Sequence, residues 1–463
     1  MELNIDIQNF GKISSAKIAV RPFTVITGCN SSGKSFITRG LYSIIYTLNQ
    51  DIVSVHLRNK ILILEQFLFQ LSEKISRQSQ RDEQLIDEFS NTLYLLKQGI
   101  AQKFDFLALL KSSDLLLSFI PEVQELRDCL NKLGAQLRVG KGTKFRSAEK
   151  EYNLLSQELE SLYNSLQNWA NVYAKSLEDE LRRAFSENFQ LSNIAGLISG
   201  NEYSLFKFGD NEAIVRIPSD GNIEFHISHT LLNDTQGLKN VVYLESPVYF
   251  KMRNVLKDSR LISVNMFRRG AVNPVPKYFY DLDELLSANL PEVSAEFQKI
   301  ADKIEKAING NLVVTPRGDI VYEENGKPPV SLHMASSGIS NMGMIALLLR
   351  RNVLDVGSFF FIDEPEMNLH TTWQHIMLDV LLDLSNAGVN VVIATHSLDM
   401  LHRLEFVVEN MSFEEAKQKI SINRLTVDGY SERCSENILL DINKAKQILG
   451  APYIEIMKKR LPK

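Results

Sequence analysis

The sequence predicts an α/β protein: a mixed sheet with an antiparallel β subdomain, interrupted by a helical, partly coiled-coil insertion. Three observations indicate this architecture. Residues 23–47 have the pattern of a strand, a Gly/Ser-rich turn and a helix. Strand patterns are then lacking to about residue 187, over a stretch in which Pro121 is the single proline. Short apolar strand patterns return at Tyr203 and continue beyond residue 390.

The composition is that of a globular protein. The chain has 463 residues, 44% of them apolar and 23% charged, which is enough for more than one structural unit. Its formal net charge of -5 gives the surface as a whole no attraction for nucleic acid. Three widely separated cysteines predict neither disulfides nor a zinc site: Cys29, Cys129 and Cys434. We expect no signal peptide and no membrane span, and hence a cytoplasmic protein.

The first functional motif lies in FTVITGCNSSGKSF, residues 23–36. It fits G-x-x-x-x-G-K-[ST], the phosphate-binding loop or Walker A motif. Its glycines let the backbone approach a polyphosphate, and the amides at the start of the next helix attract anions. Lys34 is expected to reach the β- and γ-phosphates, and the Ser35 hydroxyl to ligate Mg²⁺. The predicted ATP-binding residues are Gly28, Asn30, Ser31, Ser32, Gly33, Lys34, Ser35 and Phe36.

Two later strands end on polar side chains. The run SFFFIDEPE predicts a buried strand ending at Asp363, which would hold Mg²⁺ together with Ser35. Glu364 would orient or deprotonate the attacking water. The run NVVIAT, residues 390–395, predicts another buried strand, followed by a His396 that contacts the γ-phosphate and senses its loss. We therefore predict Glu364 and His396 as the catalytic residues.

A second anion site is predicted upstream of the acidic strand. Ser336, Ser337 and Gly338 begin an apolar helix, whose N-terminus favours a negatively charged group. A second phosphate-binding helix end in one chain indicates that it serves the nucleotide of another subunit.

The helical stretch has its own pattern. Its later part carries apolar residues at steps of four and three, typical of a heptad seam: Leu155, Leu159, Leu162, Leu166, Trp169 and Tyr173. Residues 134–144, rich in Gly and basic side chains, are interpreted as the turn of a helical hairpin. The alternative to a projecting coiled coil is a helical subdomain packed on the rest. Lys141, Lys144, Arg146 and Lys150 could touch nucleic acid, although a solvated loop is the preferred interpretation.

Together the motifs resemble an ABC-type ATPase head. The resemblance rests on the phosphate loop, the Ser-Ser-Gly helix start, FFFIDEPE, Asn368–His370 and Thr395–Ser397. These are similar to the SMC/RecF/OLD branch, as an AAA_15/AAA_21-like stand-alone ATPase without a TOPRIM domain. The resemblance implies a head that dimerises over two ATP molecules, with Mg²⁺. Ser336 and Gly338 would then contact the partner's nucleotide in trans, and Asn368–His370 would cross the dimer seam.

The chain departs from the family pattern at two positions. Ile339 stands where the family often has Gln or Glu, and Ser337 where transporters have Gly, which favours a weaker trans contact. No clear Gln-loop glutamine is visible, and Glu245 is the nearest candidate by position. The ATPase head is predicted in two parts, residues 1–47 and 190–403. The helical insertion between them is residues 48–189, and residues 404–463 form a tail that could dock a partner.

The favoured function is a Mg-ATP-hydrolysing head dimer that controls a separate effector, a nuclease or toxin. Family analogy places this role in bacterial anti-phage defence. The alternatives are a DNA-repair ATPase acting on DNA, and an ATP-locked sensor or scaffold with little turnover. A transporter subunit is disfavoured by the long separation of Lys34 from Asp363. A nuclease in the same chain is disfavoured because no Asp-x-Asp pair follows His396.

Overall fold

The computed structural model describes residues 2–75, 80–103, 113–139, 143–200, 202–210, 212–245, 248–256, 275–288 and 293–460. The chain divides into two compact units. One comprises Met1–Asn49 and Glu180–Lys463, and we call it the head unit. The other comprises Gln50–Asp179, and we call it the helical unit.

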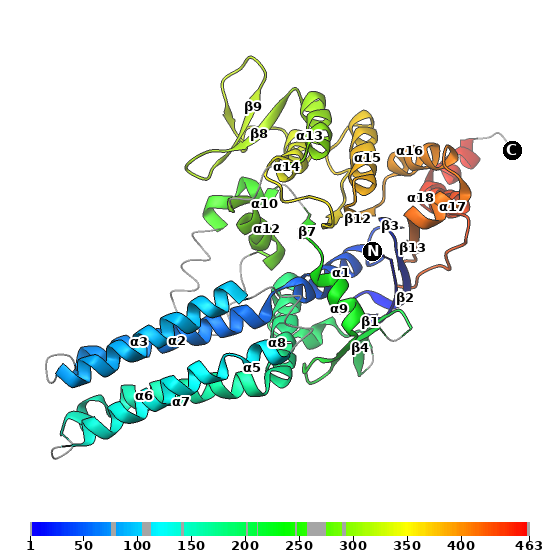
Figure 1. Cartoon of the computed structure of the whole chain (residues 1–463). Coiled ribbons are helices and arrows are strands. Elements are labelled where there is room, and N and C mark those ends of the chain that lie inside the picture. Colours follow the sequence, from blue (N-terminus) through cyan, green and yellow to red (C-terminus); the bar gives the residue numbers. More distant parts are fainter. Residues whose placement is uncertain are drawn as a thin grey trace. The chain divides into compact units, whose positions relative to one another are not determined.

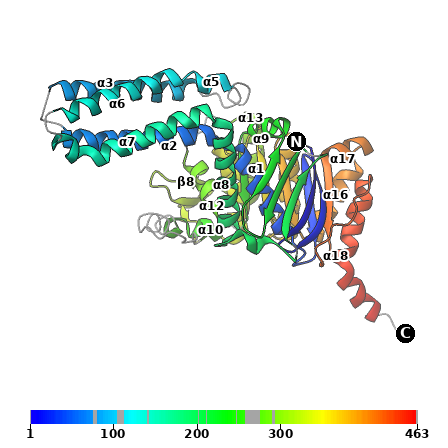
Figure 2. The same ribbon diagram turned by 90° about the horizontal axis from the view of Figure 1, so that it is seen from below.

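Strands of the head unit lie side by side in Figure 2. One sheet of this unit is parallel, and we call it the central sheet. In the described part it has five strands in the order β13-β3-β12-β11-β7, and every neighbouring pair is parallel. Its strands are β3 (Phe23–Gly28), β7 (Val241–Leu244), β11 (Phe359–Asp363), β12 (Asn390–Thr395) and β13 (Ile420–Leu425). All their residues are buried, as expected for apolar runs in a parallel sheet that is covered on both faces.

Two antiparallel sheets accompany it. One has the order β2-β1-β4-β5-β6, formed by β1 (Leu3–Phe10), β2 (Ile13–Val20), β4 (Tyr203–Phe208), β5 (Ala213–Pro218) and β6 (Glu224–Ile227). The other has the order β10-β9-β8, formed by β8 (Gly310–Val314), β9 (Ile320–Glu324) and β10 (Val330–Ser331). The predicted α/β class, with a parallel core and an antiparallel subdomain, is confirmed.

Helices cover the central sheet. Helix α1 (Lys34–Asn49) packs on β7, β11 and β12, and α15 (Thr371–Asn386) packs on β12. The remaining α-helices of this unit are α9 (His229–Gln236), α10 (Val248–Lys251), α12 (Lys277–Ser287), α13 (Ala295–Ile308), α14 (Ser337–Arg350), α16 (Leu398–Glu409), α17 (Phe413–Lys419) and α18 (Ile438–Arg460). A short 3-10 helix spans Ile194–Leu197. Helices α9, α14, α16 and α17 begin after a serine whose hydroxyl accepts from a backbone amide, the usual N-cap.

The helical unit is built from long helices that run side by side (Figure 1). They are α2 (Ile52–Ile75), α3 (Gln80–Lys103), α5 (Ser113–Leu117), α6 (Ile120–Arg138), α7 (Thr143–Gln167) and the first part of α8 (Trp169–Phe189). Helix α2 packs on α3 and α7, and α6 packs on the same two helices. Four leucines of the predicted seam are buried in this core, namely Leu155, Leu159, Leu162 and Leu166, and Trp169 and Tyr173 pack against it.

One part of the hairpin-turn prediction is wrong. Helix α6 continues to Arg138, so Gly134 is helical and does not begin a turn. A Cβ at Gly134 would lie 2.4 Å from the Tyr152 hydroxyl oxygen, so this glycine lets α6 and α7 approach closely. Residues 140–142 of the predicted turn lie outside the described residues.

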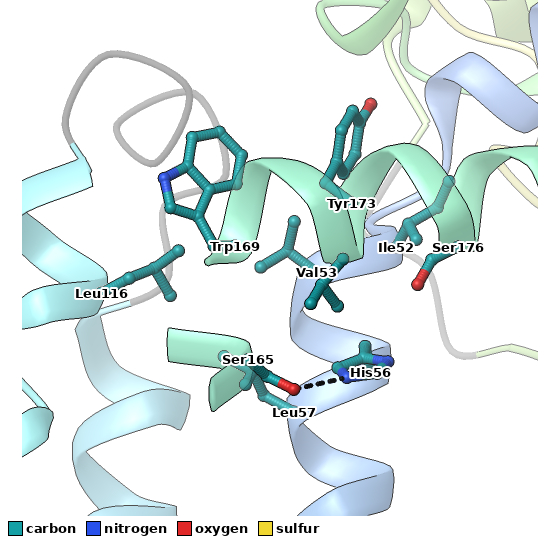
Figure 3. Close-up of a pocket in the computed structure, with 10 residues that line it drawn as sticks. Ile52, Val53, His56, Leu57, Leu116, Ser165, Trp169, Tyr173 and Ser176 are labelled. Carbon is teal, nitrogen blue, oxygen red and sulfur yellow. Dashed lines mark hydrogen bonds between the residues drawn. The ribbon is translucent and has the colours of Figure 1, made fainter. Parts of the chain in front are cut away.

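A small cavity of about 20 Å³ lies in the helical unit, between α2, α5, α7 and α8 (Figure 3). Val53, Leu57 and Leu116 line it, and His56 Nε2 lies 3.4 Å from Ser165 Oγ at its edge. This volume holds about one water molecule, so the cavity is a packing gap of the helical core.

No helix in the described ranges is both long enough and apolar enough to cross a membrane.

Candidate functional site

The parallel register of the central sheet brings the predicted motifs to one edge. Strand β12 lies between β3 and β11, with Thr395 opposite Thr27 and Ala394 opposite Asp363. Because parallel strands end at the same edge, the loop after β3, the start of the Asp363–Glu366 turn and His396 are neighbours there. This edge is where open α/β sheets bind their ligands.

The phosphate loop joins β3 to α1. Ser31 and Gly33 have left-handed φ angles of 64° and 95°, and a Cβ at Gly33 would lie 2.5 Å from Ile13 Cδ1. Lys34 and Ser35 are the first residues of α1, so their amides have no intrahelical acceptor. Ser32 is buried, and its hydroxyl has no partner among the described residues. A loop with free amides and an unpartnered hydroxyl is suited to an anion.

Lys34 is held inside this loop. Its ammonium donates to the carbonyl oxygens of Gly28 at 3.0 Å and Cys29 at 3.1 Å. Burial lowers the pKa of Lys34, against the opposing effect of three carboxylates, Glu364, Asp363 and Glu366. The three carboxylates are therefore close enough to interact electrostatically with the Lys34 ammonium, as expected if all four groups belong to one site.

Asp363, at the end of β11, is buried next to Ser35. Its Oδ2 accepts from the Tyr243 hydroxyl at 3.3 Å, while its Oδ1 is buried without a hydrogen-bond partner in the described part of the chain. Burial raises the pKa of Asp363 to about 6, against the opposing effect of the neighbouring Ser35 hydroxyl. An unpartnered carboxylate oxygen beside a hydroxyl fits Mg²⁺, which takes oxygen ligands from one or two side chains and completes its shell with phosphates and water.

Glu364 and His396 face each other across this edge. Glu364 has a left-handed φ of 51°, and its amide donates to the Ala394 carbonyl at 2.8 Å. Its Oε1 lies 3.5 Å from His396 Nδ1, and both side chains are partly exposed. A non-glycine residue in this conformation is strained, and such strain is often kept at functional sites.

Glu366 belongs to the same cluster, although no sequence pattern predicted its contacts. Its Oε1 accepts from the Thr395 hydroxyl at 2.8 Å and from the His396 amide at 2.9 Å. The side chain is buried, and its Oε2 has no partner within the described ranges. Burial raises the pKa of Glu366, and the hydrogen bond from the His396 amide opposes that rise.

The Ser336–Gly338 segment lies at the N-terminus of α14. The Ser336 hydroxyl caps the helix by accepting from the Ile339 amide at 3.2 Å, and Ser336 is exposed. Gly338 is buried, and a Cβ there would lie 3.0 Å from the Asn368 carbonyl oxygen. The segment predicted to act in trans therefore packs against the segment predicted to cross the dimer seam.

Asn341 ties α14 to the loop after β11, a contact that sequence reasoning missed. Its buried side-chain amide donates to the carbonyl oxygens of Pro365 and Met367, both at 3.1 Å. The loop between Glu364 and Asn368 is thus held by α14 on one side and by Glu366 on the other.

Two further predicted residues have other partners. The Phe36 ring stacks on Phe189 at 5.6 Å and contacts Phe10 edge-on, so it belongs to an aromatic cluster of the core. Glu245, the positional candidate for a Gln-loop residue, forms an ion pair with Arg39 and accepts from the Tyr278 hydroxyl. Asn30, at the other end of the phosphate loop, is exposed.

Comparisons with known proteins agree with the motifs. Residues 1–401 match the family model AAA_15, described as an AAA ATPase domain. The Old nuclease of Escherichia phage P2 is 25% identical over 154 residues, which are 31% of this chain and only 23% of that protein.

Two SMC heads are among the solved structures that the comparison aligns with this chain. One is the SmcHead bound to the C-winged helix domain of ScpA, with a TM-score of 0.41, 12% identity and coverage of 93% of this chain and 96% of that one. The other is the SMC head domain from Thermotoga maritima, with a TM-score of 0.34, 10% identity and coverage of 87% and 92%.

The contacts of Asn341 predict a specific stability effect. Asn341→Leu should leave two loop carbonyls without donors and lower the free energy of unfolding by about 1–3 kcal/mol for each. Thermal unfolding of purified protein measures this. Ser340→Ala, which removes one hydrogen bond to the Ser336 carbonyl in the adjacent turn, is the matched control. Equal stability of the two variants would contradict the assigned role of Asn341.

Proposed function

Since the chain belongs to the AAA_15 family of AAA ATPase domains, we propose that it binds Mg-ATP at the edge of the central sheet and hydrolyses it. The observation that carries this proposal is the convergence of the phosphate loop, Asp363, Glu364 and His396 at one edge. Strain at Glu364 and the unpartnered oxygen of Asp363 support a site that is completed by its ligand.

Each group has a distinct task in this proposal. Lys34 leaves the Gly28 and Cys29 carbonyls to bind the β- and γ-phosphates, while the amides at the start of α1 bind phosphate oxygens. Ser35 and Asp363 would hold Mg²⁺, which neutralises charge on the phosphates. Glu364 accepts the proton of the attacking water, and His396, beside it, contacts the γ-phosphate.

We further propose that two heads close over two ATP molecules, each bound by one phosphate loop and by the partner's Ser336–Gly338 segment. The exposure of Ser336 at the start of a 14-residue helix supports this, since a helix N-terminus attracts a γ-phosphate. The packing of Gly338 on the segment that contains Asn368 places both predicted interface segments together. Hydrolysis would then release the dimer.

For the biological role we propose control of a separate effector, a nuclease or toxin, in anti-phage defence. The similarity to a phage protein named Old nuclease supports a link to nuclease control, but it covers under a third of the chain. A DNA-repair ATPase and an ATP-locked sensor or scaffold with little turnover are the alternatives. The chemistry of the head is common to all of them.

The Glu364→Gln variant should separate ATP binding from turnover. Without the carboxylate base it should bind ATP normally, lose at least about 100-fold in turnover, and accumulate as an ATP-dependent dimer. Phosphate release and light scattering measure the two properties. Lys34→Ala is the companion variant and should lose ATP binding. Normal hydrolysis by Glu364→Gln would place the base elsewhere.

Subunit mixing tests the trans assignment. Ser336→Glu should repel a neighbour's γ-phosphate, and Lys34→Ala should empty the phosphate loop, so neither protein alone should turn over ATP. An equimolar mixture should recover about a quarter of wild-type turnover, because half of the random dimers carry one intact site. Ser412→Glu, at the exposed N-cap of α17, controls for the charge. No recovery in the mixture would contradict a shared site.

Purification of Glu364→Gln from its native host addresses the biological role. A trapped ATP-bound head should retain the partner that it controls, and mass spectrometry identifies it. A nuclease or toxin is expected. Duplex DNA with repair factors would instead favour repair, and a membrane permease would favour transport.

A further inference from the structure

The loop after β11 contains an acid with no task in the proposed hydrolysis. Glu366 is only 6% exposed, whereas the Glu364 and His396 side chains are 33% and 41% exposed. The loop around it is strained, because Glu364 and Asn368 both have left-handed φ angles, 51° and 60°. A buried carboxylate in such a loop requires compensating contacts.

Within the described residues, the hydrogen bonds and the ion pair of the Glu366 side chain are made with the end of β12. Its Oε1 accepts from the Thr395 hydroxyl at 2.8 Å and from the His396 amide at 2.9 Å. The same oxygen lies 3.3 Å from Nδ1 of the His396 ring. Glu366 therefore contacts both the backbone amide and the ring of His396, which lies 30 residues further along the chain.

Two carboxylates lie near the same nitrogen of the His396 imidazole. Its Nδ1 lies 3.3 Å from Glu366 Oε1 and 3.5 Å from Glu364 Oε1. Two acceptors on one side favour the form of the ring that carries a proton on Nδ1. The other ring nitrogen, Nε2, is then the one available to a phosphate oxygen.

We infer that Glu366 is the positioning residue for His396: it fixes the ring so that Nδ1–H faces the acidic pair and Nε2 faces the nucleotide. This inference rests on the proposed ATPase function. Outer-sphere carboxylates orient histidines in the same way elsewhere, by accepting from the nitrogen that does not act on the ligand. Because the His396 ring is partly exposed, it would rotate without this contact.

The unpartnered Glu366 Oε2 favours this role over a purely structural one. A single oxygen, Oε1, already satisfies the Thr395 hydroxyl and the His396 amide, which a neutral amide could also do. A buried carboxylate oxygen with no partner in the described part of the chain destabilises the fold. The negative charge is best explained by a need at the neighbouring imidazole.

A double-mutant cycle on turnover tests the inference. Glu366→Ala should lower kcat about 10-fold or more, with the KM for ATP changed less than about threefold. In a His396→Ala background the same substitution should change kcat less than about twofold, because there is no ring left to position. Equal losses in the two backgrounds would overturn the inference.

Two further variants separate positioning from structural support. Glu366→Gln keeps one acceptor oxygen for the Thr395 hydroxyl and the His396 amide but removes the charge beside the ring, so it should lower kcat by about threefold, less than Glu366→Ala does. Thr395→Val removes a hydrogen bond of Glu366 without touching the ring, and should lower kcat far less than Glu366→Ala. A Thr395→Val loss as large as that of Glu366→Ala would assign Glu366 to fold support.

Spectra of ring-¹⁵N-labelled histidine give a readout that needs no turnover. The chain has 8 histidines, and the spectrum of His396→Gln identifies the His396 signals. Wild-type protein without nucleotide should show His396 protonated on Nδ1, and Glu366→Ala should shift it to a mixture of ring forms. An unchanged His396 signal would overturn the inference even if the protein hydrolyses ATP. Absence of hydrolysis by wild type would contradict the ATPase function alone. If Glu366→Ala does not fold, Glu366→Gln takes its place in both tests. Its kcat and its His396 signal should then change in the same direction but by less. If neither changes, the inference is overturned.

Discussion

The parallel pairing of β3, β12 and β11 is the constraint on which the site depends. These strands come from opposite ends of the chain, yet their register sets Thr27 beside Thr395 and Ala394 beside Asp363. Their fully buried apolar residues leave no other arrangement that satisfies the backbone on both sides. The phosphate loop, the acidic turn and His396 are neighbours because each follows directly from one of these strands.

That dependence explains what the sequence could predict. The sheet determines the position of residues at or soon after the end of a buried strand. The proximity of Lys34, Asp363 and His396 could therefore be predicted from their local sequence patterns alone. The α/β class followed from the same runs. The roles of these residues stay predictions, since the structure gives their geometry and not their chemistry.

Other features depend on contacts that no local pattern reveals. The N-terminal hairpin and the later meander form one sheet through the pairing of β1 with β4. Three hydrogen bonds of the site also join residues that are far apart in the sequence. Tyr243 donates to Asp363, Thr395 at the end of β12 donates to Glu366, and Asn341 donates to the loop after β11. Gly134 was expected to mark a turn, but it lies inside α6, where the absence of a Cβ allows close packing against Tyr152.

A structure of the Glu364→Gln protein with ATP and Mg²⁺ would show whether these groups share one nucleotide. We expect one triphosphate contacted by Lys34, Asp363-bound Mg²⁺ and His396 of one chain, with Ser336 of a second chain at the γ-phosphate. This arrangement would be contradicted by a nucleotide away from the sheet edge, or by a γ-phosphate that neither His396 nor a neighbouring Ser336 approaches.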